Sequence, residues 1–411
     1  MKKHNTIAVI GAGVIGITTA LQLQRRGYQV TLFDKAEPAS ACSQGNAGHF
    51  ATEQIFPMAD VSLLGKLPKM LFDPMGPLSI EVSSMISNLP WFWRFLKHMR
   101  KARFQHGVAA LTALNQAALP SYQRLLAEHY YELINTNGSL LVCESQHNLD
   151  ALYDKYRRGG VSVLKLDKLQ ALNLESNLSQ RIVGALYFNE VGHSINPYHL
   201  CQWLYQRFSA AGGLFSKANI DKIVTTERRH LLQASEHTLG LFDHVVIATG
   251  AWGKSLCQQL GYNLPLIAER GYHTMVNNKA VFSRPVASSE RGFIMTPMQT
   301  GLRLAGTVEF ANVNSVPNYH RARALFTHAQ TLVELPLVEQ QEQVWVGVRP
   351  TLPDYLPVIG QAPKHDSIYF ALGHQHLGLT QAAITSECIA DLIDKKPNDI
   401  DLTPFSISRF A

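Results

Sequence analysis

Near its start the chain reads Ile7-Ala8-Val9-Ile10-Gly11-Ala12-Gly13-Val14-Ile15-Gly16, an apolar run that leads into the spacing G-x-G-x-x-G. This pattern predicts a strand, a turn and a helix, the helix running from about residue 14 to 27. A second apolar strand, 30–33, ends on Asp34. In such a unit the phosphates of a dinucleotide lie at the helix N-terminus, where free N–H groups and the helix dipole favour negative charge. The sequence therefore predicts a dinucleotide site, without identifying the dinucleotide.

Each glycine of this motif has a physical role. Gly11 makes the tight turn, Gly13 lets the backbone approach a pyrophosphate, and Gly16 lets the helix lie close on the strand. An acid at the position of Asp34 can accept hydrogen bonds from both ribose hydroxyls. The alternative is a glycine-rich turn in an ordinary βα unit.

Composition narrows the class of protein. A chain of 411 residues is long for one core, so two domains are expected, and 46% apolar with 17% charged residues is ordinary for a globular enzyme. The net charge of +6 is spread along the chain with no basic stripe that carries aromatics, so we predict no nucleic-acid partner. A protein that binds an anionic cofactor benefits from a mildly positive net charge, which is sufficient to explain the value of +6.

The cysteines argue against a disulfide framework and against a cysteine zinc site. They are odd in number, widely spaced and without a C-x-x-C pair, which favours a reducing compartment. We predict no metal site and a cytoplasmic protein. No apolar stretch of about twenty residues is present, so no membrane span is expected. The N-terminal apolar run contains the fingerprint glycines, and we interpret it as mature protein rather than as a signal peptide.

The rest of the chain alternates between helical and strand-like periodicity. Helices are expected at 90–97, 108–129, 148–158, 167–174, 198–211, 319–335 and 381–394, and strands at 139–143, 244–247, 272–276, 292–296, 302–306 and 368–372. The 198–211 helix has Asn196 as N-cap and Pro197 in its first turn. The segment from about 55 to 131 is interpreted as a helical insertion. Its aromatic and basic run from Trp91 to Arg103 favours a core-facing stripe with a solvated basic side, and a membrane-surface helix is the alternative.

Four motifs in order carry a resemblance to a known family. They are the fingerprint with Asp34, then Ser43-Gln44-Gly45-Asn46-Ala47-Gly48, then Ala248-Thr249-Gly250-Ala251-Trp252, and finally Gly347-Val348-Arg349-Pro350-Thr351-Leu352-Pro353-Asp354 with Gly373-His374-Gln375-His376-Leu377-Gly378-Leu379-Thr380. Over its whole length the chain resembles the FAD-dependent D-amino acid oxidase/dehydrogenase superfamily, in its bacterial D-amino acid dehydrogenase branch. The C-terminal motifs, together with Arg270-Gly271-Tyr272-His273, look closest to dehydrogenases of D-proline-type substrates such as cis-4-hydroxy-D-proline.

The resemblance implies an α/β fold of the D-amino acid oxidase type. We expect a Rossmann-type FAD-binding domain formed by 1–55, 190–264 and 346–411. A second α+β substrate domain, built on an antiparallel sheet and carrying the helical insertion, is expected from 56–189 and 265–345. A single fingerprint beside a sheet-rich second domain also fits a flavoenzyme whose only nucleotide is FAD.

The implied reaction removes a hydride from Cα of an amino acid to flavin N5. Such a dehydrogenase passes its electrons to a quinone or a carrier, which would fit contact with the inner face of a membrane. One alternative is an FAD-dependent oxidase of glycine, sarcosine or another N-methyl amino acid. An alternative of another class is a flavin-binding protein without turnover.

The resemblance also implies which residues bind the FAD. Non-covalent binding is expected, because His49 does not sit in a full match to a histidyl-flavin motif and Cys388 lies inside the closing helix. The predicted cofactor-binding residues are Gly11, Gly13, Val14, Ile15, Gly16, Asp34, Lys35, Ser43, Asn46, Ala47, Gly48, His49, Ala248, Thr249, Gly250, Trp252, Gly373, Gly378, Leu379 and Thr380.

Arg349 is the predicted carboxylate clamp. A guanidinium forks onto a carboxylate with two parallel bonds and stays charged when partly buried. Its alternative is a structural ion pair. Tyr272 and His374 are further candidates for catalysis, and Tyr272, His273 and His376 for substrate binding. Histidines beside such a loop can instead orient backbone or pack.

Overall fold

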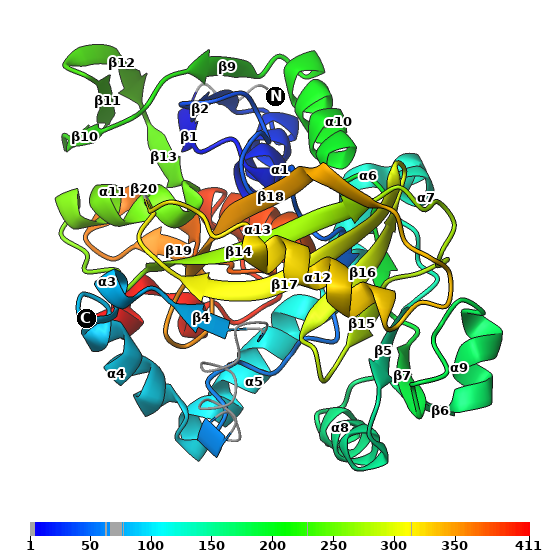
Figure 1. Ribbon diagram of the computed structural model, residues 1–411. Helices are drawn as coiled ribbons and strands as arrows, with labels where there is room; N and C mark the ends of the chain where they lie inside the picture. Colours follow the sequence, from blue (N-terminus) through cyan, green and yellow to red (C-terminus); the bar gives the residue numbers. More distant parts are fainter. Residues whose placement is uncertain (1–4, 62–63, 66–75, 77, 228, 314) are drawn as a thin grey trace.

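The computed structural model describes residues 5–61, 64–65, 76, 78–227, 229–313 and 315–411 (Figure 1). The parts of the predicted domain ranges that fall on the remaining residues lie outside this description. Four sheets organise the described residues.

The fingerprint lies in a six-stranded sheet with the order β19-β20-β13-β1-β2-β9. Five neighbouring strands run parallel, and only β19 is antiparallel to its neighbour β20. Helices α1, α10 and α13 pack on it, with α1 against both α10 and α13. The elements are β1 (Thr6–Ile10), α1 (Val14–Arg25), β2 (Gln29–Asp34), α10 (Pro197–Ala210), β9 (Leu214–Lys217), β13 (His244–Ile247), β19 (Val358–Ala362), β20 (His365–Leu372) and α13 (Gly378–Ile393).

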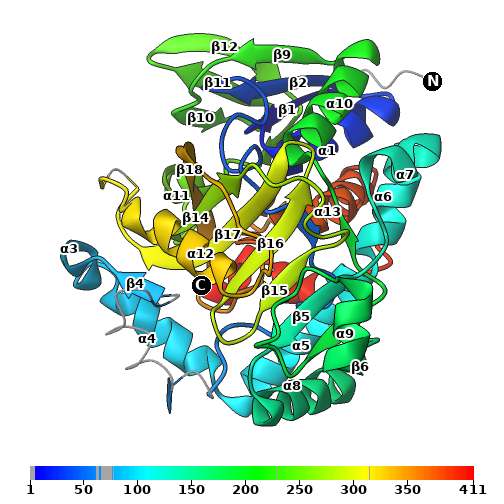
Figure 2. The same ribbon diagram turned by 45° about the vertical axis from the view of Figure 1, so that its right-hand side comes forward.

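The second large sheet has nine strands and is mostly antiparallel. Figures 1 and 2 show helix α12 lying across its outer side, away from α13. Its strands, with this helix, are β4 (Leu78–Ile80), β5 (Ser139–Cys143), β6 (Leu164–Asp167), β7 (Gly184–Phe188), β14 (Ile267–Val276), β15 (Val286–Ser288), β16 (Phe293–Met298), β17 (Gly301–Phe310), α12 (His320–Gln330) and β18 (Glu339–Thr351). The predicted fold class, a parallel α/β sheet with a second antiparallel sheet, is confirmed.

Two smaller sheets complete the strands. One is β10 (Lys222–Thr225), β11 (His230–Ala234) and β12 (His237–Phe242), and the other pairs β3 (His49–Phe50) with β8 (Gly192–His193). The remaining α-helices with bounds among the described residues are α3 (Val82–Met85), α4 (Leu89–His98), α5 (Lys101–Gln116), α6 (Ala118–Leu126), α7 (Tyr130–Leu133), α8 (Gln146–Arg158), α9 (Lys168–Leu174) and α11 (Gly253–Gln259). The short β3–β8 pair matters for function, because it fixes His49 next to the large sheet.

The predicted single helix 108–129 is wrong: two helices, α5 and α6, cover it with a break at Ala117. Pro120 gives the reason. Proline lacks an N–H and is tolerated in the first turn of a helix, so a new helix beginning at Ala118 accommodates it. Leu114 of α5 and Tyr122 of α6 are fully buried in the same core as α1 and α13, so the helical insertion packs on the parallel sheet's side.

The aromatic run of α4 divides between core and solvent. Trp91 and Phe95 are buried and stack with their ring centroids 5.3 Å apart, whereas Trp93 is 60% exposed beneath Lys97. The expected core-facing stripe therefore includes Trp91 and Phe95 but not Trp93.

The C-terminal segment crosses from one sheet to the other after Thr351. Strand β18 pairs with β14 from Val276↔Glu339 to Ile267↔Thr351, so Arg349 belongs to the large sheet. The sequence ranges had placed residue 346 onward with the parallel sheet. The division into two domains stays a prediction, with the change of sheet falling between β18 and β19.

Candidate functional site

The three fingerprint glycines form a cradle that side chains would fill. A Cβ on Gly11, whose φ is +106°, would lie 2.4 Å from the carbonyl oxygen of Ala248, and one on Gly16 would lie 1.7 Å from the Gly11 oxygen. A Cβ on Gly13 would meet only the Ser43 Oγ, at 3.4 Å. Gly11 and Gly16 are therefore required by the fold, while Gly13 keeps one side of the loop open for a ligand.

Polar groups surround this cradle at the ends of β1, β2 and β13. The Asp34 Oδ2 accepts from the Ala12 N–H at 2.7 Å, and the Ser43 Oγ accepts from the Val14 N–H at 2.9 Å, at the start of α1. The Thr249 Oγ1 is buried without a hydrogen-bond partner among the described residues. A buried hydroxyl of this kind calls for a partner, and a bound ligand can supply one. Lys35 lies 4.4 Å from the ring centroid of Trp252 and covers the same edge.

The N-terminal loop and the C-terminal helix are joined by side chains. The Asn46 Oδ1 accepts from the Gly48 N–H at 2.8 Å, and Arg303 donates to the Asn46 carbonyl. The Thr380 Oγ1 accepts from the Ala51 N–H at 3.0 Å. Helix α13 begins at Gly378, three residues earlier than expected, so its N-terminal end reaches this loop.

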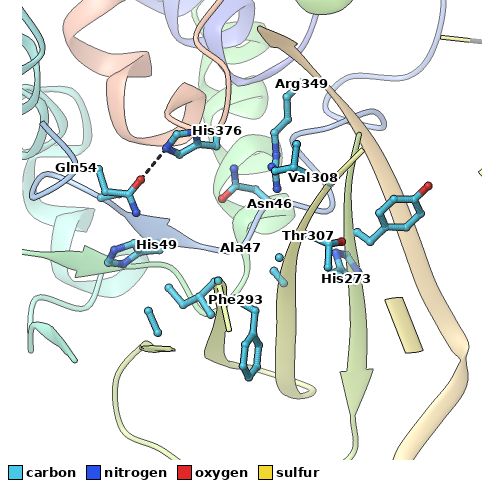
Figure 3. A pocket seen from close by; sticks show the side chains of 18 of the residues that line it. Asn46, Ala47, His49, Gln54, His273, Phe293, Thr307, Val308, Arg349 and His376 are labelled. Carbon is cyan, nitrogen blue, oxygen red and sulfur yellow. Dashed lines mark hydrogen bonds between the residues drawn. The ribbon is translucent and has the colours of Figure 1, made fainter. Parts of the chain in front are cut away.

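A cavity of about 370 Å³ lies between the N-terminal loop, the large sheet and the turn before α13 (Figure 3). Figure 3 shows the side chains of Arg349, Asn46 and His376 converging from different elements. Of the predicted site residues it is lined by Asn46, Ala47, His49, Tyr272, His273, Arg349 and His376.

Arg349 is held in this cavity by two features of β14. Its Nη1 donates to the Glu269 Oε1 at 3.0 Å, and Glu269 is itself 1% exposed. A Cβ on Gly271 would lie 2.2 Å from the Arg349 Nη2, so the guanidinium lies directly against the glycine backbone. A guanidinium has five N–H donors, and Glu269 accepts from only one of them. The group can therefore still donate two parallel hydrogen bonds to an anion in the cavity.

Comparison with known proteins decides the family. Residues 6–392 match the family described as FAD dependent oxidoreductase, DAO. The chain is 33% identical over 421 residues to a D-amino-acid oxidase of Bradyrhizobium diazoefficiens, with 100% of both chains covered. The chain belongs to the DAO family of FAD-dependent oxidoreductases.

Two further similarities place this flavoenzyme among its relatives. It is 27% identical to a D-amino acid dehydrogenase of Agrobacterium fabrum over 98% of this chain and 99% of the relative. The fold is that of glycine oxidase from Geobacillus kaustophilus, with a TM-score of 0.77 at 22% identity over 99% of this chain and 100% of that one.

The residues of the cradle fit FAD. Gly13 leaves the loop open beside the N-terminus of α1, and the unpaired Thr249 hydroxyl lies at the end of the neighbouring β13. When bound, FAD supplies the hydride acceptor for the reaction. That it binds without a covalent bond stays a prediction, as do the individual contacts expected of the predicted residues. Among the described residues, no helix of this oxidoreductase is long and apolar enough to cross a membrane.

The Tyr272 hydroxyl is hydrogen-bonded to residues outside the cavity lining. The hydroxyl donates to the Glu309 carboxylate and accepts from the Asn318 N–H at 3.0 Å. Side chains alternate between the faces of a strand, so Glu269 bonds Arg349 on the face that carries His273, while Arg270 and Tyr272 bond Glu309 on the other. Burial and Glu309 raise the pKa of Tyr272 to about 12. Its ring borders the cavity, and its predicted roles in catalysis and substrate binding stay predictions.

His374 lies behind the cavity. Its Nε2 is bonded to the Thr385 Oγ1 of α13 at 3.0 Å, it is 3% exposed, and it does not line the cavity. This contact holds the turn before α13, and the predicted catalytic role of His374 stays a prediction.

His273 and His376 do line the cavity. His273 stacks on Trp345 with centroids 5.0 Å apart and its Nδ1 is 3.0 Å from the Gly45 carbonyl oxygen. The Nε2 of His376 donates to the Gln54 Oε1 at 2.7 Å (Figure 3). Burial lowers the pKa of His273 to about 3 and that of His376 to about 4. Both are neutral at physiological pH, so they shape the pocket rather than serve as acids.

Thr307 is a cavity residue that the sequence analysis missed. It is the extra residue of a bulge in β17, because Gly271 pairs with Val308 and Tyr272 with Gly306. Its φ is +54°, and its Oγ1 is buried without a partner among the described residues. A β-branched residue at positive φ is rare and costly, and such strain is concentrated at functional sites. No sequence signal marks it, since threonine ordinarily favours regular strand geometry.

Glu53 was missed as well. It lines the cavity, and its Oε1 lies 2.9 Å from the Nε2 of His49. The available signal was a single acid in an otherwise uncharged stretch just after the glycine-rich loop.

Gly271→Ala is expected to weaken substrate binding without loss of FAD. The added methyl group would need the space of the Arg349 guanidinium, which must then move away from Glu269. Losing one hydrogen bond to a charged group corresponds to roughly 10- to 150-fold in affinity. Steady-state KM for the substrate together with the ratio of flavin to protein absorbance checks this. An unchanged KM in a fully flavinated variant would contradict the placement of Arg349.

Acid is expected to destabilise this flavoenzyme between pH 6.5 and 4. Burial chiefly lowers the pKa of seven described histidines: His98 and His244 to a smaller extent, His193, His230 and His376 to about 4, and His273 and His374 to about 3. Below pH 6.5 the unfolded chain binds protons that the folded chain does not, so stability falls with pH until the folded pKa values are reached. Each histidine contributes up to about 1.4 kcal/mol per pH unit.

Chemical denaturation at pH 7.5, 6 and 5 measures this dependence. His374→Gln, which keeps a polar group near Thr385, should show a shallower slope than the wild type. Equal slopes for the two proteins would show that His374 does not carry the effect.

Proposed function

We propose that this enzyme dehydrogenates a D-amino acid, favouring D-proline or cis-4-hydroxy-D-proline, by removing a hydride from Cα. The observation that carries the proposal is the Arg349 guanidinium, held by Glu269 over Gly271 in a cavity beside loops that fit FAD. Arg349 binds the substrate carboxylate with two parallel hydrogen bonds and thereby orients the Cα–H bond. Orientation of this kind supplies much of the rate when the amine is already neutral.

The remaining lining supports a small ring-shaped substrate. Leu141, Phe188 and Phe293 provide apolar walls, which hold an apolar ring and exclude water. His273 and His376 are neutral, and neither adds a competing positive charge beside Arg349. The two curated relatives described above, an oxidase and a dehydrogenase of D-amino acids, support the coarser substrate class. The D-proline preference rests on the C-terminal motifs and on Arg270–His273.

An oxidase of glycine or sarcosine is the second candidate, favoured by the similarity to glycine oxidase. Anaerobic mixing with D-proline, cis-4-hydroxy-D-proline, D-alanine, glycine and sarcosine separates the candidates, because substrate bleaches the flavin band near roughly 450 nm. We expect the cyclic D-amino acids to bleach it fastest. Fastest bleaching by glycine or sarcosine would favour the second candidate, and none with any amine would contradict an amino acid substrate. Peroxide assay in air then separates oxidase from dehydrogenase.

We also propose that helix α4 contacts an anionic membrane surface, from which a quinone can accept electrons. Leu89, Trp93 and Leu96 lie on one exposed face of α4, with Arg100, Lys101 and Arg103 exposed just after it. An apolar stripe flanked by cations is typical of interfacial helices.

Co-sedimentation with vesicles tests this contact. Vesicles containing phosphatidylglycerol should retain the protein and pure phosphatidylcholine vesicles should not. Lys101→Glu should weaken retention at least about fivefold, since each cation near an anionic surface contributes about 1 kcal/mol. Equal retention of Lys101→Glu and the wild type would contradict the contact.

A further inference from the structure

The cavity has a second polar end, formed by Glu53 and His49. The Glu53 side chain is 8% exposed and its Oε1 is bonded to the His49 Nε2 at 2.9 Å. Its Oε2 is buried and has no hydrogen-bond partner among the described residues. An unpaired buried carboxylate oxygen is costly, so a donor from a bound molecule is expected to satisfy it.

This end lies across His376 from the carboxylate clamp. Figure 3 shows His49 and Gln54 on one side of His376 and Arg349 on the other. Arg349, His376 and Glu53 all line this one cavity, and the charges of Arg349 and Glu53 both act on the pKa of His376. The cavity therefore has room for a substrate whose carboxylate binds Arg349 to extend past His376 toward the end that Glu53 lines.

The number of open acceptors favours a hydroxyl as the donor. A hydroxyl has one O–H to donate, and the Glu53 Oε2 is one acceptor without a partner among the described residues. An ammonium group has three N–H donors and would need more acceptors. The other lining residues near this end include Leu141, Tyr156 and Phe188. Among such walls an ammonium group would lose its hydration with too few acceptors to replace it.

We propose that Glu53 determines specificity by accepting a hydrogen bond from a hydroxyl on the substrate, at the end remote from the carboxylate. The inference rests on the proposed function, because it takes the substrate carboxylate to lie at Arg349. For a D-proline-type substrate the donor is the ring hydroxyl of 4-hydroxy-D-proline. Glu53 thus separates hydroxylated from unsubstituted rings, since an unsubstituted ring leaves the carboxylate unpaired.

Binding of two ring-oxygen analogues to the FAD-loaded enzyme tests this. Tetrahydrofuran-2-carboxylate and its cis-4-hydroxy derivative, in the D-like configuration, have no amine to oxidise, and flavin difference spectra give their Kd values. We expect the hydroxylated analogue to bind the wild type roughly 10- to 150-fold more tightly. Glu53→Ala should abolish that ratio and leave the Kd of the unsubstituted analogue unchanged. Glu53→Gln, which keeps the size and one acceptor oxygen, should retain part of it.

Several results would overturn the proposal. They are equal affinity of the wild type for both analogues, or an undiminished ratio in Glu53→Gln and Glu53→Ala. Loss of FAD from Glu53→Gln, measured by the ratio of flavin to protein absorbance, would assign the open oxygen to the cofactor instead. Glu132→Gln, at an exposed acid of α7, is the matched control. If Glu53→Ala does not fold, the ratio of the two Kd values in the wild type still tests the proposal. These Kd values involve no turnover, so they do not depend on whether the enzyme carries out the proposed reaction.

Discussion

Arg349→Lys raises the dissociation constant of the amino acid by roughly 10- to 150-fold while FAD stays bound, because an ammonium group cannot reproduce the second of two parallel hydrogen bonds to a carboxylate. Lysine keeps the positive charge opposite Glu269, so the fold is preserved. Arg349→Ala removes that charge as well and leaves the buried Glu269 without its cation, at a further cost of about 3 kcal/mol in stability.

The saturation of anaerobic flavin reduction with substrate concentration measures this dissociation constant for Arg349→Lys. Thermal unfolding of the same preparation is the control for the fold. An unchanged constant in a fully flavinated Arg349→Lys enzyme would make Arg349 a structural ion pair and remove it from the site.

The second large effect separates two glycines of the fingerprint. Gly16→Ala should yield little folded protein, because its Cβ would lie 1.7 Å from the backbone oxygen of Gly11 and neither backbone can retreat. Gly13→Ala should fold, because its Cβ would meet only the end of the Ser43 side chain at 3.4 Å. The methyl group of Gly13→Ala instead occupies the side of the loop where the pyrophosphate approaches.

Soluble yield, circular dichroism of the apoprotein and FAD titration distinguish the two variants. We expect a folded Gly13→Ala apoprotein with weakened FAD affinity, and no such apoprotein for Gly16→Ala. Equal FAD affinity of Gly13→Ala and the wild type would show that the cofactor does not approach the loop at this residue.

Local sequence signals predicted much of the fold because they act over a few residues. Asn196 caps α10 as expected, accepting from the His199 N–H at 2.9 Å, with Pro197 in the first turn. The strand of residues 139–143 was predicted at its observed bounds. The break between α5 and α6 was not predicted, because the apolar stripe continues through it. Pro120 was the local signal for the start of a new helix.

The site was predicted less completely, because it depends on register between distant strands. The alternation of side chains along β14 decides on which face Tyr272 lies. The bulge that contains Thr307 lies in a different strand, β17. Similarly, Glu269 precedes Arg349 by 80 residues in the chain and meets it only through the pairing of β14 with β18. His374 and His376 belong to one motif, yet only His376 reaches the cavity, since the turn before α13 directs the two side chains to different partners.

We propose that substrate oxidation depends on a carboxylate bound at Arg349, and a compound that lacks only this carboxylate tests the dependence. The rate of anaerobic flavin bleaching is measured in the wild type with cis-4-hydroxy-D-proline and with pyrrolidin-3-ol, which has the same ring and hydroxyl but no carboxylate. We expect the amino acid to bleach the flavin, and the efficiency for pyrrolidin-3-ol to be lower by at least about two orders of magnitude, because a charge-assisted bidentate pair is lost. Equal efficiency for the two compounds would contradict it.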